Sequence, residues 1–186
     1  MKRNQTAYVI LGLLSIEPHQ SGYDIHKTIQ GSVGYFWGES YGQIYPTLKR
    51  LAAEGLIVPS QSTSADRPRR QEYSITEAGH ARLKEWLAMP YRADPPRDEF
   101  LLKLFFGWEA APGVSIGHVR AFQDQLRRLL ATLLEIETLG RARHSDNPHF
   151  PFWMLTLTYG VAQIRCALEW SESALAMLTS AADPNA

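Results

Sequence analysis

The sequence predicts a mainly α-helical protein with one small β-hairpin, built as a compact N-terminal domain and a C-terminal domain of long helices. Over most of the chain, apolar residues recur every three or four positions, which is the spacing of helices that bury one face. Two short stretches near residues 56–75 have the alternation of strands instead. A segment with three prolines, residues 89–98, separates the two regions. We therefore expect domains at 1–88 and 99–186, joined by a linker at 89–98.

Composition limits the function classes without naming one. Of the 186 residues, 45% are apolar, which is enough for packed cores and too many for a disordered chain. The formal net charge is zero, but residues 1–90 hold ten Lys and Arg against eight Asp and Glu, a balance of +2. The single cysteine, Cys166, excludes a disulfide framework within the chain and a multi-cysteine metal site. The apolar run at 7–16 is too short to span a membrane, so we expect a cytoplasmic protein without a membrane partner. We also expect no metal and no cofactor.

The first two predicted helices cover residues 3–15 and 22–30. The first has Val9, Leu13 and Ile16 on one side, and the second is capped by Ser21 ahead of Ile25 and Ile29. The glycine-punctuated connection at 31–39 is compatible with a short strand.

The third predicted helix, within residues 40–57, has an unusual outer face. Ile44, Leu48 and Leu51 form a buried stripe, and Gly55 is a natural residue to end the helix. The other sides carry small and positively charged residues, namely Gly42, Gln43, Pro46, Thr47, Lys49, Arg50 and Ala53. A proline inside a helix costs about 3 kcal/mol, so we expect either a bend or a later helix start. For Lys49 and Arg50 alone, an ordinary solvated face is the simpler interpretation.

The remaining elements follow in the order hairpin, short helix, linker and long helices. Residues 56–61 and 70–76 read as strands, with Tyr73 and Ile75 on one face. Residues 76–90 return to helical spacing, with Leu83 and Leu87 on a stripe beside Trp86. A short apolar helix at 99–110 precedes two long ones near 115–143 and 151–181. Their apolar stripes exceed what the chain itself needs, and a second copy of the chain is the most economical partner.

Three helices followed by a hairpin is the layout of a winged helix-turn-helix, whose recognition helix enters the DNA major groove. Gln43 and Thr47 are suited to base edges, and Lys49 and Arg50 to the phosphate backbone. Arginines near the hairpin tip suit phosphate or a narrow minor groove. Tyr41 and Tyr45 flank the buried stripe, so both core packing and phosphate contact remain open. The predicted DNA-binding residues are Lys2, Ser40, Tyr41, Gln43, Tyr45, Pro46, Thr47, Lys49, Arg50, Arg67, Arg69 and Arg70.

The segments GYDI at 22–25, GQIYPTLKRLAAEGLI at 42–57 and RPRRQEYSITEAGHARLKEWL at 67–87 resemble the signature of PadR-type transcriptional regulators. RDEFLLKLFFG at 97–107 is similar to the start of their helical dimerisation region. The positions matching the family's motifs are Tyr45, Pro46, Lys49, Arg50, Arg69, Arg70, Tyr73, Thr76 and Gly79. The Ser-rich run PSQSTSAD is longer than in many relatives. The resemblance implies a homodimeric repressor of a double-stranded DNA operator, released by a small-molecule effector such as a phenolic acid or a drug-like aromatic compound.

The candidate effector site lies near the start of the last predicted helix, where aromatic residues gather. Aromatic clusters are more often core than ligand pocket, and His149, Trp153 and Tyr159 are the candidates that the sequence offers. A different function class is a winged-helix protein-interaction module that does not bind DNA. Charge reversal at Arg69 and Arg70 discriminates the two, since only a DNA-binding protein would lose duplex binding. The sequence has no nucleophile elbow, paired-His metal motif or phosphate loop, so we do not expect an enzyme.

Overall fold

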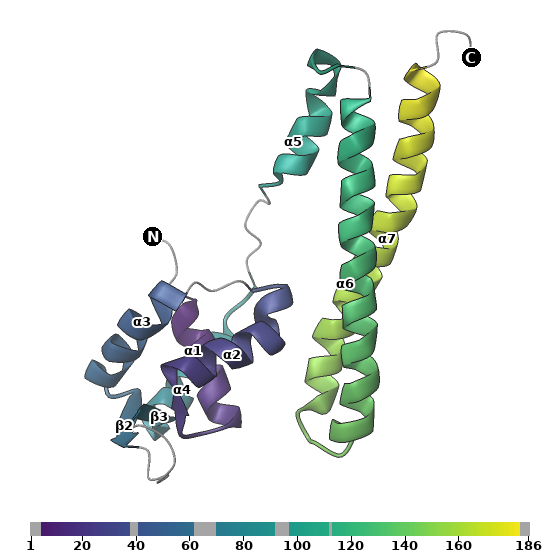
Figure 1. The fold of residues 1–186 in the computed structure, drawn as a ribbon. Coiled ribbons are helices and arrows are strands. Elements are labelled where there is room, and N and C mark those ends of the chain that lie inside the picture. The colour runs from purple at the N-terminus through teal and green to yellow at the C-terminus, as the bar shows by residue number, and fades with distance from the viewer. Residues whose placement is uncertain (1–4, 38–40, 62–69, 92–96, 112, 183–186) are drawn as a thin grey trace. The chain divides into compact units, whose positions relative to one another are not determined.

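The computed structural model describes residues 5–37, 41–61, 70–91, 97–111 and 113–182 of the chain. Its helices and strands are α1 (Thr6–Ile16), β1 (Gln20–Ser21), α2 (Gly22–Gly31), η1 (Val33–Tyr35), α3 (Tyr41–Ala53), β2 (Ile57–Gln61), β3 (Gln71–Ile75), α4 (Glu77–Ala88), α5 (Glu99–Phe105), η2 (Gly107–Glu109), α6 (Val114–His144) and α7 (Phe150–Ala182) (Figure 1). The chain divides into two compact units, residues 1–93 and 94–186, and each is described by itself.

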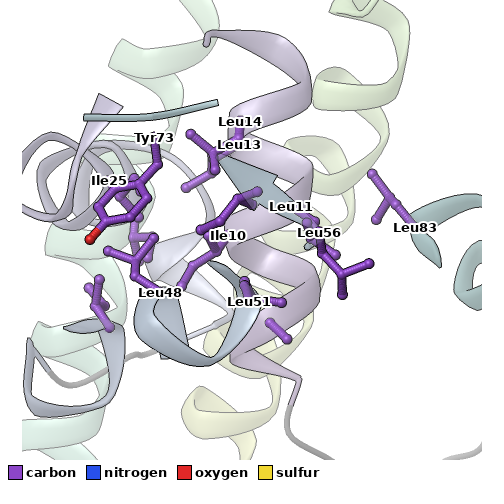
Figure 2. Packing of buried hydrophobic residues seen from close by; sticks show 14 residues of the cluster. Ile10, Leu11, Leu13, Leu14, Ile25, Leu48, Leu51, Leu56, Tyr73 and Leu83 are labelled. Carbon is purple, nitrogen blue, oxygen red and sulfur yellow. The ribbon is translucent and has the colours of Figure 1, made fainter. Parts of the chain in front are cut away.

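The first unit packs its helices around α1. Ile10, Leu11, Leu13 and Leu14 of α1 are buried and form the centre of one cluster of apolar side chains. In Figure 2 they lie between Ile25 and Tyr73 on one side and Leu56 and Leu83 on the other, with Leu48 and Leu51 of α3 beside them. Burial also raises the pKa of the Tyr73 hydroxyl. Since α2, α3, α4 and the sheet all contribute to this cluster, the unit buries a core of its own.

A three-stranded antiparallel sheet, in the order β1-β3-β2, completes the first unit. β2 and β3 form the predicted hairpin, with Ile57 opposite Ile75 and Gln61 opposite Gln71. The two-residue strand β1 was not predicted; Gln20 lies opposite Tyr73 and Ser21 opposite Glu72. His19, which precedes β1, has φ of 62° and donates its N–H to Ser74 Oγ at 3.2 Å. The fold class is confirmed, with one more strand than the hairpin.

Ser21 is at once the last residue of β1 and the N-cap of α2, as predicted for its capping role. Its hydroxyl accepts from the Asp24 N–H at 3.3 Å, and its own N–H donates to Asp24 Oδ2 at 3.1 Å. This reciprocal pair is a capping box. It fixes the start of α2 to the sheet. The following connection is a 3₁₀ turn at Val33–Tyr35, so the short strand suggested for residues 31–39 is not found in their described part.

The second unit is a helical hairpin of α6 and α7 with α5 packed on α6 (Figure 1). Leu126, Leu133, Val161 and Ile164 are buried between the two long helices. Near the other end, Phe100 of α5 stacks on Phe122 of α6 with ring centroids 4.2 Å apart. The two long helices and the short one before them were predicted from their apolar spacing.

Candidate nucleic-acid interface

Helix α3 turns its apolar stripe inward, as the sequence predicts. Ile44, Leu48 and Leu51 are buried, and Gly42, Pro46 and Lys49 on the opposite side are exposed. The helix runs from Tyr41 through Pro46 to Ala53, so a start after Pro46 is wrong. No described carboxylate forms a salt bridge with Lys49. The outer face of α3 therefore carries small side chains in its N-terminal half, which let the helix backbone come close to a binding partner. One turn later the same face carries the positive charge of Lys49.

Thr47 does not belong to this outer face. Its side chain is 5% exposed and lies within the unit. The reason is its position three residues after Ile44 and four before Leu51, which places it on the buried stripe. The sequence-based assignment of Thr47 to base reading is corrected accordingly, and Thr47 is left out of the interface.

Tyr45 lies on the flank of α3 that faces α2. A side chain at Gly22, the first residue of α2, would collide with the Tyr45 ring, so ring and helix backbone are in close contact. The Tyr45 side chain is nevertheless 41% exposed. The core-packing interpretation of this residue is thus met in part, since the ring packs between α3 and α2. Contact of its exposed part with phosphate stays a prediction.

The other flank of α3 carries Gln43 and Arg50 and faces α1 and α4. Gln43 Oε1 lies 3.4 Å from the Thr6 hydroxyl, which donates to it. Arg50 Nε lies 3.6 Å from Glu54 Oε1 and lines a shallow groove together with Tyr8 and Trp86. Lys49 and Arg50 therefore differ, because only Lys49 lies at the centre of the outer face and Arg50 is engaged at its edge.

The end of α3 connects the helix to the hairpin. Gly55 has φ of 71°, its N–H donates to the Ala52 carbonyl, and the Leu56 N–H donates to the Leu51 carbonyl at 2.9 Å. This is the Schellman pattern, which confirms the predicted role of Gly55. Thr76 then donates its hydroxyl to the Gly55 carbonyl at 2.8 Å.

The start of α4 is hydrogen-bonded to the same residue, Thr76. Thr76 Oγ1 also accepts from the Gly79 N–H, so Thr76 caps α4. A side chain at Gly79 would overlap the Leu56 carbonyl oxygen. The end of α3, the hairpin and α4 thus meet within a few residues, which fixes the hairpin relative to α3.

Arg70, the residue just before β3, is exposed and lies over the ring of Tyr23 in the first turn of α2, 5.4 Å from the ring centroid. Tyr23 is 50% exposed. Tyr23 therefore lies largely at the surface, whereas Tyr73 is buried on the inner face predicted for the second strand. Tyr23 was missed because its contact with Arg70 depends on the β1–β3 pairing, which leaves no periodic signal in so short a strand.

Several predicted residues lie outside the described part of the chain. These are Lys2, Ser40, Arg67 and Arg69, and for Tyr41 only the backbone at the start of α3 is described. Their assignment to DNA binding stays a prediction.

The three effector candidates are not brought together as a group. The rings of His149 and Trp153 are 6.4 Å apart, and His144 contacts Trp153 from the end of α6 at 6.0 Å. Tyr159 lies six residues after Trp153, which rotates it by about 120° around α7. It is exposed, and its hydroxyl accepts from Gln163 Nε2 at 2.9 Å. None of the three candidates lines the groove beside Arg50.

Helix α7 has a second apolar face that the sequence analysis did not resolve. Along the side opposite its contact with α6 lie exposed residues at spacings of three, four, seven and eleven, here called the outer stripe: Phe152, Leu155, Tyr159, Cys166 and Met177. Their heptad-like spacing was readable in the sequence and is typical of a helix that packs against another helix.

Other kinds of site find no support in the part of the chain that the structure describes. No group of three or more His, Cys, Asp and Glu side chains there could hold a metal ion. Among the same residues, no helix combines the length and apolarity needed to cross a membrane.

Comparison with known families matches both units. Residues 10–85 match the model of the transcriptional regulator PadR-like family, and residues 96–179 match the model of the virulence activator alpha C-terminal region. The first match covers the helices and hairpin of the candidate interface, and the second covers α5, α6 and most of α7.

Two characterised relatives cover nearly the whole chain. The negative transcriptional regulator PadR of Bacillus subtilis is 30% identical over 92% of this chain and 96% of its own length. Its crystal structure with operator DNA has a TM-score of 0.84 and 28% identity over 96% of this chain and 99% of that one. Its complex with p-coumaric acid has a TM-score of 0.74 and 30% identity over 93% and 98%. The Vibrio cholerae virulence activator AphA has a TM-score of 0.73 and 29% identity over 94% and 98%.

Proposed function

The chain belongs to the PadR-like family of transcriptional regulators, and from this premise we propose that it is a homodimeric repressor of a double-stranded DNA operator, released by a small aromatic effector. It is a regulator and not an enzyme. The observation that carries the DNA-binding part is the outer face of α3, where Lys49 stands one turn beyond the small residues of its N-terminal half. Arg70 adds a second positive charge next to β3.

The proposed contacts divide along α3. The N-terminal half, with Gly42 at its centre and the exposed parts of Gln43 and Tyr45 at its two edges, faces the base edges. Lys49 meets the phosphate backbone as the helix leaves the groove. Arg50 is engaged with Glu54 and contributes less. We keep Lys2, Ser40, Tyr41, Pro46, Arg67 and Arg69 in the proposed interface on the strength of their positions in the sequence.

Repression is proposed by analogy with the Bacillus subtilis relative, which is described as a negative regulator. AphA, which has a similar fold, is described as an activator, so proteins of this fold include both repressors and activators. Of these two relatives, the Bacillus subtilis regulator has the higher TM-score, in its complex with operator DNA, and we therefore favour repression for this chain.

The effector is proposed to be a phenolic acid or a similar aromatic compound, because the Bacillus subtilis relative forms a complex with p-coumaric acid. His149 and Trp153, whose rings lie side by side, are the residues proposed to contact it. Tyr159 shares the outer stripe of α7, so a role in dimerisation is favoured for it.

The homodimer is supported by the outer stripe. Leu155, Phe152 and Met177 are each at least two-thirds exposed in a single chain. Apolar residues aligned along about seven turns of one helix favour a partner helix, and a second copy supplies one of matching length.

The test is binding of the full-length protein to a labelled duplex carrying its own upstream intergenic DNA, measured by fluorescence anisotropy over a range of salt. We expect preference over a scrambled duplex and affinity that falls steeply with salt. Lys49→Ala should weaken binding on the order of tenfold and lower the salt slope by about 0.9 for each phosphate that the variant no longer neutralises. Arg50→Ala should cost less, because its guanidinium is engaged with Glu54.

Lys84→Ala is the matched control, since Lys84 is an exposed lysine of α4 in the same unit and its removal changes the net charge equally. A wild-type protein that selects no fragment from a library of genomic DNA would contradict the proposal. Equal losses of affinity for Lys49→Ala and Lys84→Ala would instead place the interface elsewhere on the unit.

A further inference from the structure

The contact between Arg70 and Tyr23 joins two elements that a winged helix-turn-helix needs in fixed relation. Tyr23 is the second residue of α2, and Arg70 immediately precedes β3. The guanidinium carbon lies 5.4 Å from the ring centroid, within the range of a cation–π interaction.

The strand register explains why the two side chains meet. Ser21 of β1 lies opposite Glu72 of β3. Tyr23 follows Ser21 by two residues and Arg70 precedes Glu72 by two, so both lie just beyond the same end of the β1–β3 pair. The chain turns into α2 at Gly22, and the capping box of Ser21 and Asp24 holds that turn in place. Tyr23 is thus held by the capped start of α2, and Arg70 directly precedes Gln71, which is paired with Gln61 of β2.

The geometry leaves the charge of Arg70 available. No carboxylate within the described ranges forms a salt bridge with its guanidinium. A guanidinium stacked on an aromatic face keeps its N–H donors at the edge of its plane, where they can bind phosphate in a forked arrangement. Stacking also restricts a long side chain that would otherwise lose rotamer freedom on binding. The half-exposed ring of Tyr23 therefore acts as a platform at the surface.

We propose that Tyr23 is a positioning residue for DNA binding, whose ring holds the Arg70 guanidinium beside the wing in the orientation that meets the phosphate backbone. This inference rests on the proposed function. Tyr23 acts through Arg70 and needs no contact of its own with DNA.

The test compares Tyr23→Leu, Tyr23→Phe, Arg70→Ala and the double variant Tyr23→Leu/Arg70→Ala in the full-length protein, on the upstream duplex over a range of salt. Tyr23→Phe keeps the ring and should bind like wild type. Tyr23→Leu should weaken binding about 2- to 5-fold, the range expected when an exposed cation–π interaction is removed. Arg70→Ala should weaken it more and lower the salt slope. The double variant should bind like Arg70→Ala alone, because Tyr23 has nothing left to position.

Tyr91→Leu is the control for replacing an exposed tyrosine of the same unit, since Tyr91 is 90% exposed. Unfolding midpoints should be equal for all variants. Additive effects on affinity in the double variant would overturn the inference, and so would a Tyr23→Phe variant as weak as Tyr23→Leu, which would indicate a direct hydroxyl contact.

A DNA-free measurement separates this inference from the proposed function. In the free protein, the ring current of Tyr23 should shift the Arg70 δ-proton resonances upfield, and Tyr23→Leu should abolish that shift. Unshifted resonances in wild type would overturn the contact itself. A clear shift in a protein that prefers no DNA sequence would refute the proposed function and with it the positioning role. Selective binding that Tyr23→Leu leaves unchanged would refute the positioning role alone.

Discussion

The two units of this chain solve the problem of apolar surface in different ways. Residues 1–93 bury side chains from every helix and from the sheet in one cluster around α1. Residues 94–186 bury a narrow seam between α6 and α7 and leave large apolar side chains exposed on α5 and α7, including Leu102, Phe105 and Leu155. The difference does not come from composition, because both units are rich in apolar residues.

The contrast lies in how the elements are arranged. Short helices crossing a sheet can surround a centre, whereas two long helices side by side cover only one face of each other. From this we expect the first unit to keep its structure as a single chain and the second to depend on a partner. The following predictions test that division.

The largest effect is expected inside the first unit. Leu48 is fully buried in the cluster around α1, so Leu48→Ala should lower the free energy of unfolding by about 2–5 kcal/mol. Urea denaturation, with hydrogen exchange of peptides from residues 5–91, would measure the change. It should not depend on protein concentration. A decrease below about 1 kcal/mol would mean that this core is less well packed than the burial of Leu48 indicates.

The next effect concerns the outer stripe. Leu155 is 67% exposed in the single chain, so Leu155→Asp should disturb no buried contact within the chain, but it should dissociate a dimer formed along the stripe. Without two-site binding, operator affinity should then fall on the order of 100-fold. Sedimentation velocity would report the mass. The rate of maleimide labelling at Cys166, the one cysteine of the chain, should rise in the variant.

Ala176→Asp places the same charge on an exposed position of α7 away from the stripe and should leave both mass and labelling unchanged. A wild-type protein that sediments as a monomer at micromolar concentration would refute the dependence of the second unit on a second copy.

The smallest effect is a difference in alkaline stability between the units. Burial raises the pKa of Tyr73 in the folded protein. Above about pH 10 the unfolded chain therefore releases this proton while the folded chain retains it, and stability falls by at most about 1.4 kcal/mol for each pH unit. Below pH 10 the group contributes no pH dependence. Tyr73→Phe should remove this part of the decline.

The second unit offers the comparison, because its one tyrosine, Tyr159, is exposed. Unfolding of the two units followed separately by hydrogen exchange between pH 9 and 11 would measure the difference. A Tyr73→Phe variant with the same alkaline decline as wild type would contradict the prediction.

Periodicity predicted most of the fold because most elements are amphipathic helices. The stripe of Ile44, Leu48 and Leu51, the cap at Ser21 and the helix end at Gly55 all follow from local sequence rules, and each is confirmed. The error at Thr47 arose within the same rule, since a polar residue on the buried stripe was assigned to the opposite face. Leu87 was predicted to share the inward stripe of α4 with Leu83, but its side chain is exposed. Leu87 lies in the last turn of α4, beyond the end of the core.

What the sequence could not supply is pairing between distant segments. The two-residue strand β1 is too short to have a period, yet it determines that Tyr23 meets Arg70. The engagement of Arg50 with Glu54 and the groove of Tyr8 and Trp86 likewise depends on how α1, α3 and α4 pack. Neighbouring residues of equal charge, Lys49 and Arg50, were therefore indistinguishable until the packing was known.

The double role of Ser21, in strand β1 and in the cap of α2, also has a consequence for how the gene can change. Deleting or inserting one codon for residues 17–19 would displace both the pairing of Gln20 with Tyr73 and the start of α2. By contrast, β2 and β3 are already in register at Gln61 and Gln71, so codons added between these positions leave the paired strands as they are. Length variation among descendants of this gene is therefore expected to accumulate at the hairpin tip and to be absent between α1 and α2.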